Sequence, residues 1–516
     1  MHVLRLRLLT TQSDETEINR RFHAVSHLHN VMTREAVRRL NRLKQDPDYQ
    51  KAKAGYGSVI STAEENRTDD EKRIMKDAVE AMNDCTEKCG LTKQAFELYL
   101  KKCQKTQFRK MISSQQAQKE ADRVFSGVEK VLYGSGQKIH FKKFRDFDTI
   151  SGKSNINGAK FDKAAFSIDW LGLHIRCDIS RDIDYIRESI SGNDVSYCEI
   201  KRMMFNNGWH YYVLVYLSGD APRRDIRSEG SCMGIDPGMS TIAGFSDTRC
   251  VLEELAPCVK EYNDRISDLQ HMTDWKKRLL NPKKYNEDGT VDRTNKDPWI
   301  FSKSYLKLRD RLKALYRQKT AYVRQSHLEL IYKLLEDSID FIAEDMNWTA
   351  LAKRSKKTER QMKPTELKQK DGTVRTVYKY KKKRRFGKSV NDRSPGLFMM
   401  LLEQKAVMYG GTFNAVDTAS FRASQYDHVR DECIKVPLSL RMKTVGGHLV
   451  QRDLYSAFLI RNSDDAYEAP DRWKCIASFE TFLRHQGTEL LCVMGRSERP
   501  SPCFGLKRLH HRRNDC

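Results

Sequence analysis

Three acidic residues, each placed where an apolar segment meets a polar break, constrain the fold of this chain more than any other feature. Asp236 follows the apolar run that begins at Met233, and Glu344 ends the run Ile339–Ala343. Asp453 lies in the predicted first turn of an amphipathic helix. Strand ends and helix starts meet at one edge of an open α/β sheet. The pattern therefore predicts an α/β domain in which three carboxylates converge, and such a group can hold divalent ions for phosphodiester hydrolysis.

Each of the three segments also has a simpler interpretation. The Asp-Pro-Gly at Asp236 is ordinary turn chemistry. Glu344 with Asp345 fits a strand that ends at the surface, and Asp453 fits a carboxylate at the positive end of a helix dipole. The order of the segments and the basic sequence around them favour one shared site.

The charge of the chain points to a polyanionic partner. Its 516 residues include 93 Lys and Arg against 69 Asp and Glu, a formal net charge of +24. Such an excess is typical of proteins that bind nucleic acid. A membrane surface would also attract it, but no apolar run reaches the roughly 18 residues that a transmembrane helix requires. The run Val3–Leu9 contains two arginines and is too short for a signal peptide, so it predicts a strand in a chain expected in the cytoplasm.

The 13 cysteines show no metal-binding spacing, because the sequence contains no Cys-x-x-Cys pair. Cys85 and Cys89 are four residues apart, which is the spacing of one helix face, and no second pair lies near them. In a cytoplasmic chain such cysteines are interpreted as reduced thiols.

The first part of the chain changes from strand to helix and back to strand. Residues 1–10 predict a strand, and Asp14 with Glu17 predicts a capping-box variant that starts a helix. Helical sequence continues to about residue 132, with a loop expected at about 45–61. Strands are expected over 138–217, including a hairpin around Asn206-Asn-Gly. The strand at 1–10 is expected to join this sheet, which makes the helical block an insertion.

The second part of the chain alternates strands and helices after a polar linker at about 219–231. The pattern predicts a strand–turn–strand at Met233–Phe245, a long helix striped from Tyr305 to Leu335, and a short strand before Glu344. A highly basic segment follows at 353–388. The remaining expectations are a helix at Pro395–Tyr409, a strand at Thr412–Asp417, the helix of Asp453, and a mixed tail from Asp464.

The motifs around the three acids have a family resemblance. The series Gly-Ile-Asp-Pro-Gly, Ile-Ala-Glu-Asp-Met-Asn and Arg-Asp-Leu-Tyr-Ser-Ala resembles the three split motifs of the RuvC-like nuclease domain in transposon-encoded TnpB proteins and type V CRISPR effectors. The segments that begin at Arg385, Asn391 and Val416 agree with the sequence that this family places between its second and third motifs. The resemblance covers roughly 232–462, and over 1–220 it depends on layout alone.

The resemblance implies a multidomain α+β chain. It would contain an RNase H-like (RuvC) α/β nuclease domain and a wedge-like β-barrel into which a helical recognition lobe is inserted. The implied boundaries are 1–12 and 133–220 for the barrel, 13–132 for the lobe, 221–231 for a linker, 232–421 and 449–464 for the nuclease domain, 422–448 for an insert that binds target nucleic acid, and 465–516 for a C-terminal tail.

The resemblance also implies the site and its cofactors. Asp236, Glu344 and Asp453 would be both the catalytic and the metal-binding residues, and Asp345 would not take part. The cofactors would be two Mg²⁺ ions, or Mn²⁺, and a guide RNA, and the target would be double-stranded DNA.

One feature departs from the family. Its insert before the last aspartate usually carries two Cys-x-x-Cys pairs that bind zinc, but here Cys433, His428 and His448 are the nearest equivalents. Their spacing fits no standard zinc knuckle, so we expect no structural zinc. Packing or contacts to nucleic acid would then hold the insert.

Basic and polar side chains near these segments are candidates for nucleic-acid contacts. Cations can neutralise phosphates, tyrosines can stack on bases, and a guide–target duplex is bound through its shape and backbone charge. A basic run is equally consistent with a solvated surface and no partner, whereas Trp209 and Tyr211 are expected in the core. The candidates are Arg20, Arg34, Arg38, Tyr380, Lys381, Lys382, Arg384, Arg385, Lys388, Arg422 and Gln425.

The function that these observations predict is an RNA-guided DNA endonuclease with one RuvC-like site, in a prokaryotic cytoplasm and at the nucleoid when bound to DNA. A non-cleaving RNA-guided regulator is an alternative, although such a protein would be expected to lose one of the acids. An unguided resolvase or transposase-type nuclease is another, although it needs no large region before the nuclease domain. The origin and length of the guide, the target-adjacent motif and the oligomeric state stay open.

Overall fold

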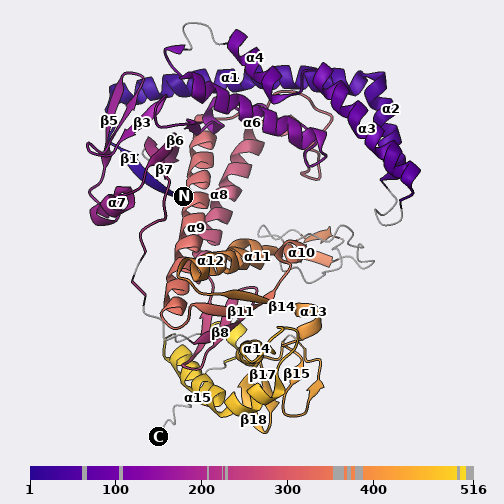
Figure 1. Ribbon diagram of the computed structural model, residues 1–516, viewed down its shortest axis with the longest axis vertical. Helices are drawn as coiled ribbons and strands as arrows, with labels where there is room; N and C mark the ends of the chain where they lie inside the picture. Colours follow the sequence, from indigo (N-terminus) through magenta and orange to yellow (C-terminus); the bar gives the residue numbers. More distant parts are fainter. Residues whose placement is uncertain are drawn as a thin grey trace. The chain divides into compact units, whose positions relative to one another are not determined.

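Two units make up the chain in the computed structural model, Met1–Arg224 and Asp225–Cys516. The structure describes residues 1–60, 67–103, 109–205, 208–223, 225–226, 231–352, 387–437, 439–496 and 500–506, together with the backbone of 365–368 and 374–377. Figure 1 shows the helices and strands of both units, and each unit is described by itself.

A seven-stranded antiparallel sheet forms the centre of the first unit, with the strand order β2-β6-β7-β1-β5-β4-β3. β1 lies between β5 and β7, so the strand at the start of the chain joins the sheet as expected. β3 returns to lie beside β6, which curls the sheet into a half-barrel. The strands are β1 His2–Leu8, β2 Thr149–Ser151, β3 Ala159–Asp162, β4 Ser167–Trp170, β5 Leu173–Asp178, β6 Val195–Phe205 and β7 Gly208–Leu217. The pairing of Phe205 with Gly208 confirms the predicted hairpin.

Helices inserted between β1 and β2 pack against this sheet. They are α1 Gln12–Gln45, α2 Pro47–Val59, α3 Asp69–Lys88, α4 Lys93–Cys103 and α6 Ser114–Leu132. The short helix η2 Phe144–Asp146 follows α6 and precedes β2, and the helix α7 Ile183–Ile190 lies between β5 and β6.

Three local predictions in this unit are wrong. The cap of α1 is Thr11, whose hydroxyl accepts from the Asp14 backbone N–H, so Asp14 is the third helical residue and not the cap. The expected loop at 45–61 is mostly α2, because Asp46 caps it and Pro47 suits the first helical position. The strands expected over 138–217 are also interrupted by α7, which is eight residues long and lies in strand-rich sequence.

A buried arginine connects the first helix to the sheet. Arg202 of β6 donates to the carbonyl oxygen of Phe147 at 3.0 Å and to the side chain of Asn19 at 2.9 Å. Its guanidinium lies 4.5 Å from the centre of the Trp209 ring, and burial lowers its pKa to about 10. Trp209 packs against the core and Tyr211 is buried in it, as predicted.

The sheet of the second unit is mixed, with the strand order β10-β9-β8-β11-β14. β10, β9 and β8 are antiparallel neighbours, whereas β11 is parallel to both β8 and β14. The two parallel pairs therefore bring the carboxyl ends of β8, β11 and β14 to one edge. The strands are β8 Cys232–Pro237, β9 Thr241–Phe245, β10 Cys250–Glu254, β11 Asp340–Asp345 and β14 Phe413–Asp417.

Helices cover both faces of this sheet, which confirms an architecture that mixes helices and sheets. Phe341 of β11 packs in a core with α9 Lys303–Leu335 and α12 Pro395–Met408, two helices that the sequence predicted. Ile342 packs on the opposite face, in a core with α14 Arg452–Arg461 and α15 Arg472–Arg496.

The segment expected as a C-terminal tail contributes to this second core. Phe479, Phe482 and Val493 of α15 are buried there, and so is Phe504 of the short helix η4 Pro502–Phe504. The spacing of Phe479, Phe482 and Val493 follows one face of α15, a periodicity that the mixed composition of the segment obscures.

The remaining elements of the second unit connect these layers. They are the helices α8 Val259–Leu280, η3 Pro282–Lys284, α10 Trp348–Ala352, α11 Gly387–Arg393 and α13 Thr418–Phe421, and the hairpins β12 Thr365–Lys368 with β13 Val374–Val377, β15 Tyr426–Asp427 with β16 Glu432–Cys433, and β17 Met442–Val445 with β18 His448–Gln451. Among the described residues, no helix is both long and apolar enough to span a membrane.

Candidate functional site

Strand pairing brings Asp236 and Glu344 together. In the parallel pair of β8 and β11, Ala343 lies opposite Ile235, and the two acids are the next residues along each strand. Neighbouring residues of parallel strands at the same register point to the same face. Both side chains are half-buried at the edge where these strands end.

The helix of the third acid crosses the same face. Gly234 precedes Asp236 by two residues, so the two share a face of β8. A Cβ atom on Gly234 would overlap the carbonyl oxygen of Ala457 and would lie 2.8 Å from the Cα of Arg461, both in α14. Only glycine therefore allows α14 to lie this close to the strand. Asp453 is one helical turn before Ala457.

Alternation along β11 separates Glu344 from its neighbour. Glu344 shares its face with Ile342, which packs in the core of α14, whereas Ala343 packs in the core of α9 and α12. Asp345 follows on the face of Ala343 and is exposed. The geometry therefore places Glu344, and not Asp345, on the side of Asp236 and α14.

Burial and mutual repulsion act on the first two carboxylates. The pKa of Asp236 is raised well above its usual range, first by burial and then by the negative charges of Glu344 and Asp453. Burial raises the pKa of Glu344 to about 7. Within the part of the chain that the structure describes, neither carboxylate has an ion-pair partner. The pair therefore lacks a direct ion-pair partner among those residues, and the charges of Arg452 and Arg441 offset only part of the repulsion at Asp236.

Two arginines compensate the third carboxylate. An Nη atom of Arg441 lies 3.0 Å and 3.3 Å from the two carboxylate oxygens of Asp453, and an Nη atom of Arg452 lies 3.1 Å from one of them. Gln451 donates to the other oxygen at 3.3 Å and also caps α14 by accepting from the Leu454 backbone N–H. These partners were not predicted from the sequence, since only Arg452 is adjacent to the acid.

The three acids are thus on one side of the sheet, but their side chains are not close enough together to form a complete set of metal ligands. Among the described residues, no three His, Cys, Asp or Glu side chains are grouped so as to hold a metal ion. The chemistry of Asp236, Glu344 and Asp453 nevertheless suits Mg²⁺ or Mn²⁺, because these ions prefer carboxylate oxygens. A cation would also relieve the repulsion that raises the pKa of Asp236.

The raised pKa of Glu344 predicts a measurable dependence of stability on pH. Between about pH 4.5 and 7 the folded protein keeps a proton that the unfolded chain releases, so the free energy of unfolding falls as pH rises and levels off above 7. We expect Glu344→Gln to gain stability relative to the wild type across this range, measured by thermal unfolding in EDTA. Asp345→Asn is the matched control. If the difference in stability between Glu344→Gln and the wild type is the same at every pH, the prediction is contradicted.

Aromatic packing holds the insert before α14. His428 is buried, and its Nδ1 lies 2.7 Å from the hydroxyl oxygen of Tyr455. Its ring contacts the rings of Phe458 and Phe479, from α14 and α15. Lys443 lies 4.1 Å from the centre of the Tyr455 ring, and burial lowers its pKa to about 8.

The other two residues considered for zinc have different surroundings. Cys433 is exposed, and the ring of His448 contacts the edge of Phe479. The expectation that the insert binds no zinc stays a prediction.

The predicted nucleic-acid residues have different surroundings. Arg38 forms a two-point ion pair with Glu35 at 2.7 Å and 2.9 Å, and Arg20 lies 3.4 Å from Glu17. Arg34 is exposed on the same helix, α1.

The candidates in the second unit lie on two short segments. Lys388 is exposed on α11. Arg422 is exposed in a left-handed conformation, with a φ of 49°, after α13, and its carbonyl oxygen accepts from the Gln425 backbone N–H at 2.9 Å. The remaining candidates, Tyr380, Lys381, Lys382, Arg384 and Arg385, lie outside the described residues.

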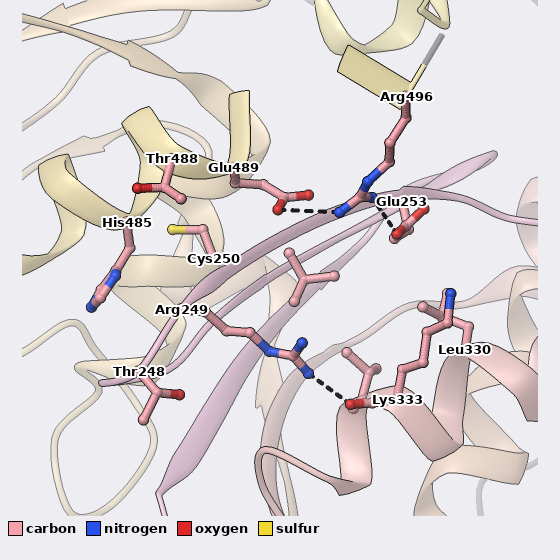
Figure 2. Close-up of a pocket in the computed structure, with 12 residues that line it drawn as sticks. Thr248, Arg249, Cys250, Glu253, Leu330, Lys333, His485, Thr488, Glu489 and Arg496 are labelled. Atoms are coloured by element: carbon pink, nitrogen blue, oxygen red, sulfur yellow. Dashed lines mark hydrogen bonds and ion pairs between the residues drawn. The ribbon is translucent and has the colours of Figure 1, made fainter. Parts of the chain in front are cut away.

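A separate cavity of about 540 Å³ lies beside the edge strand β10, between β10, α9 and α15 (Figure 2). Its arginines already have partners. Arg496 lies 2.6 Å from a carboxylate oxygen of Glu253, and Arg249 donates to the carbonyl oxygen of Lys333 at 2.6 Å (Figure 2). The buried Glu489 also accepts from the Leu252 backbone N–H at 3.1 Å, which protects this edge strand.

Comparisons with known proteins give similarity in structure only. No protein-family model matches the chain, and no curated protein matches its sequence. A cryo-EM structure of a Cas12f1–sgRNA–target DNA complex is similar with a TM-score of 0.45 and 11% identity, over 89% of this chain and 98% of that one. A CRISPR–Cas12f ternary complex is similar with a TM-score of 0.24 and 10% identity, over 90% of this chain and 99% of that one. The chain is thus similar to Cas12f structures over most of its length, at low identity.

Proposed function

We propose that this protein is a metal-dependent, RNA-guided DNA endonuclease with one RNase H-like, RuvC-type site formed by Asp236, Glu344 and Asp453. One observation carries the proposal. Two carboxylates occupy neighbouring positions at the ends of parallel strands, on the face that α14 crosses, and have no ion-pair partner among the described residues. A bound divalent cation would stabilise such a site, because like charges in a buried site repel each other when no cation is present.

The three acids would have one role in common, the binding of the metal ions. Asp236, Glu344 and Asp453 would hold Mg²⁺ or Mn²⁺, which when bound activates water and stabilises the leaving oxygen of a phosphodiester. The strands β8 and β11 fix the separation of the first two side chains. Arg441 and Arg452 place two guanidinium groups beside Asp453, and such groups bind phosphate oxygens. They would attract the DNA backbone to the acids.

The guide RNA is supported by the sequence motifs and by charge. The three motifs occur in the order and with the neighbouring segments of RNA-guided nucleases, and the chain has a net charge of +24. A positively charged protein that delegates sequence recognition to base pairing needs diffuse phosphate contacts more than base-reading side chains.

A test uses the wild-type protein and the RNA that co-purifies with it. The bound RNA is sequenced, and a DNA duplex matching its guide segment is offered in Mg²⁺ and, separately, in EDTA. We expect cleavage of the matched duplex in Mg²⁺, none in EDTA, and RNA retention in both, because the ion serves chemistry and the guide is held by phosphate contacts.

Three other results would contradict the proposal, each in a different way. Cleavage that continues in EDTA would exclude a metal site. Cleavage of unmatched DNA by RNA-free protein would favour an unguided nuclease. Guided binding without cleavage in either Mg²⁺ or Mn²⁺ would favour a regulator.

A further inference from the structure

The helical hairpin of α8 and α9 ends in an exposed apolar stripe. We call residues 272–309, from the last turns of α8 to the first turns of α9, the hairpin tip. Met272, Trp275 and Leu279 of α8 are 43%, 60% and 65% exposed and follow the i, i+3, i+7 spacing of one helical face. Exposed apolar side chains that are grouped in this way mark interaction surfaces.

The hairpin tip is also strongly basic. It contains ten Lys and Arg against five Asp and Glu. Three of the acids make local bonds: Asp274 with Arg278 at 2.6 Å, and Asp288 and Asp292 with threonine residues two positions later. The exposed cations are Arg278, Lys283, Arg293, Lys296, Lys303 and Lys307.

The loop between the helices gives the tip a defined scaffold. Lys284 is buried, and its ammonium group donates to the carbonyl oxygens of Asn295, at 3.0 Å, and Asp297. The ammonium group of Lys277 lies 4.0 Å from the centre of the Trp299 ring, so two aliphatic stems and one indole fill the inside of the loop. Trp275 is outside this packing, and among the described residues the cation over its ring is that of Lys276, at 5.5 Å.

We propose that the hairpin tip binds an unpaired segment of RNA, with Trp275 stacking on a base and the lysines neutralising neighbouring phosphates. An indole face stacks on any base, and exposed cations follow a single-stranded backbone. Lysine is depleted in protein–protein interfaces, so the four exposed lysines, Lys283, Lys296, Lys303 and Lys307, favour a polyanion over a protein partner. The evidence for a binding surface comes from the residues of the hairpin tip alone. Only the identification of the bound strand as RNA rests on the proposed function.

The test measures binding of an unstructured, fluorescein-labelled RNA of about 16 nucleotides to the full chain after high-salt removal of bound RNA. We expect Trp275→Ala to weaken binding about 5- to 140-fold, the range that loss of one stacked base gives. Lys303→Ala with Lys307→Ala should reduce the slope of log affinity against log salt by roughly 0.7 for each phosphate that these lysines neutralise.

Trp473→Ala is the matched control. Trp473 is 77% exposed on α15, but its neighbours Arg472 and Lys474 already pair with Asp431 and Asp465. Its replacement should therefore leave RNA binding unchanged. Both tryptophans are at the surface, so thermal unfolding should show that both variants fold.

Several results overturn the inference. One is wild-type RNA affinity in Trp275→Ala, or a loss no larger than that of Trp473→Ala. Binding of the same-sequence DNA but not the RNA would also overturn it, as would a Trp275→Ala defect confined to phosphatidylserine vesicles or to self-association. Guided DNA cleavage by the wild type, measured in the same preparations, tests the proposed function separately, because it does not depend on the Trp275 comparison.

Discussion

Replacing Glu344 by Gln is expected to reduce guided DNA cleavage by about 10³-fold or more, whereas replacing the adjacent Asp345 by Asn leaves it within about twofold. The large loss follows because a catalytic metal contributes several kcal/mol, and each 1.36 kcal/mol is tenfold in rate. The small effect at Asp345 is that of an exposed substitution away from the site. The measurement is the single-turnover rate on a matched duplex in Mg²⁺.

The physical basis of this contrast is the alternation of side chains along β11. Glu344 points to the face of Ile342 and α14, where Asp236 also lies, and Asp345 points to the other face. Asp236→Ala should match the loss of Glu344→Gln while RNA and DNA binding persist, because binding depends on phosphate contacts elsewhere. Retained cleavage in Asp236→Ala, or an equal loss in Asp345→Asn, would refute the site.

Replacing Gly234 by Ala is expected to lower the free energy of unfolding by about 3 kcal/mol or more and to displace α14. Its Cβ would overlap the backbone of Ala457 and lie 2.8 Å from the Cα of Arg461. Inserting one methyl group into a packed core costs about 1–3 kcal/mol when side chains can adjust, and here the obstacle is helix backbone. The measurement is urea unfolding, with cleavage recorded on protein that remains folded.

Gly244→Ala provides a matched comparison in the neighbouring strand β9. Its Cβ would lie 3.1 Å from the Met233 sulfur and 3.3 Å from the Ile235 Cδ1, and both are ends of flexible side chains. We therefore expect a smaller loss of stability and no displacement of Asp453. If both variants lose the same stability, the close approach of α14 to β8 is not the cause.

Local patterns predicted the elements that carry their own signal. Periodicity and turn residues correctly predicted three elements: the helix that contains Tyr305 and Leu335, the helix that begins at Pro395, and the hairpin at Gly208. The apolar runs before Asp236 and Glu344 are strands for the same reason.

The errors arose where local sequence is ambiguous. Polar sequence around Asp46 suggested a loop, but a capping aspartate before a proline starts α2 there. The mixed composition of the C-terminal segment predicts a tail, although Phe479 and Phe482 pack in one core with α14. Composition does not show which residues will meet a partner surface.

The sequence by itself determined the identity and order of the three acids, because each marks the end of an apolar strand or the start of a helix. Only the tertiary structure decided which acids face one another, since that depends on the parallel pairing of β8 with β11 and on the crossing of α14 at Gly234. It also decided that Arg441, twelve residues before Asp453, pairs with it. Strand order and helix crossing are set by non-local packing, which no local pattern encodes.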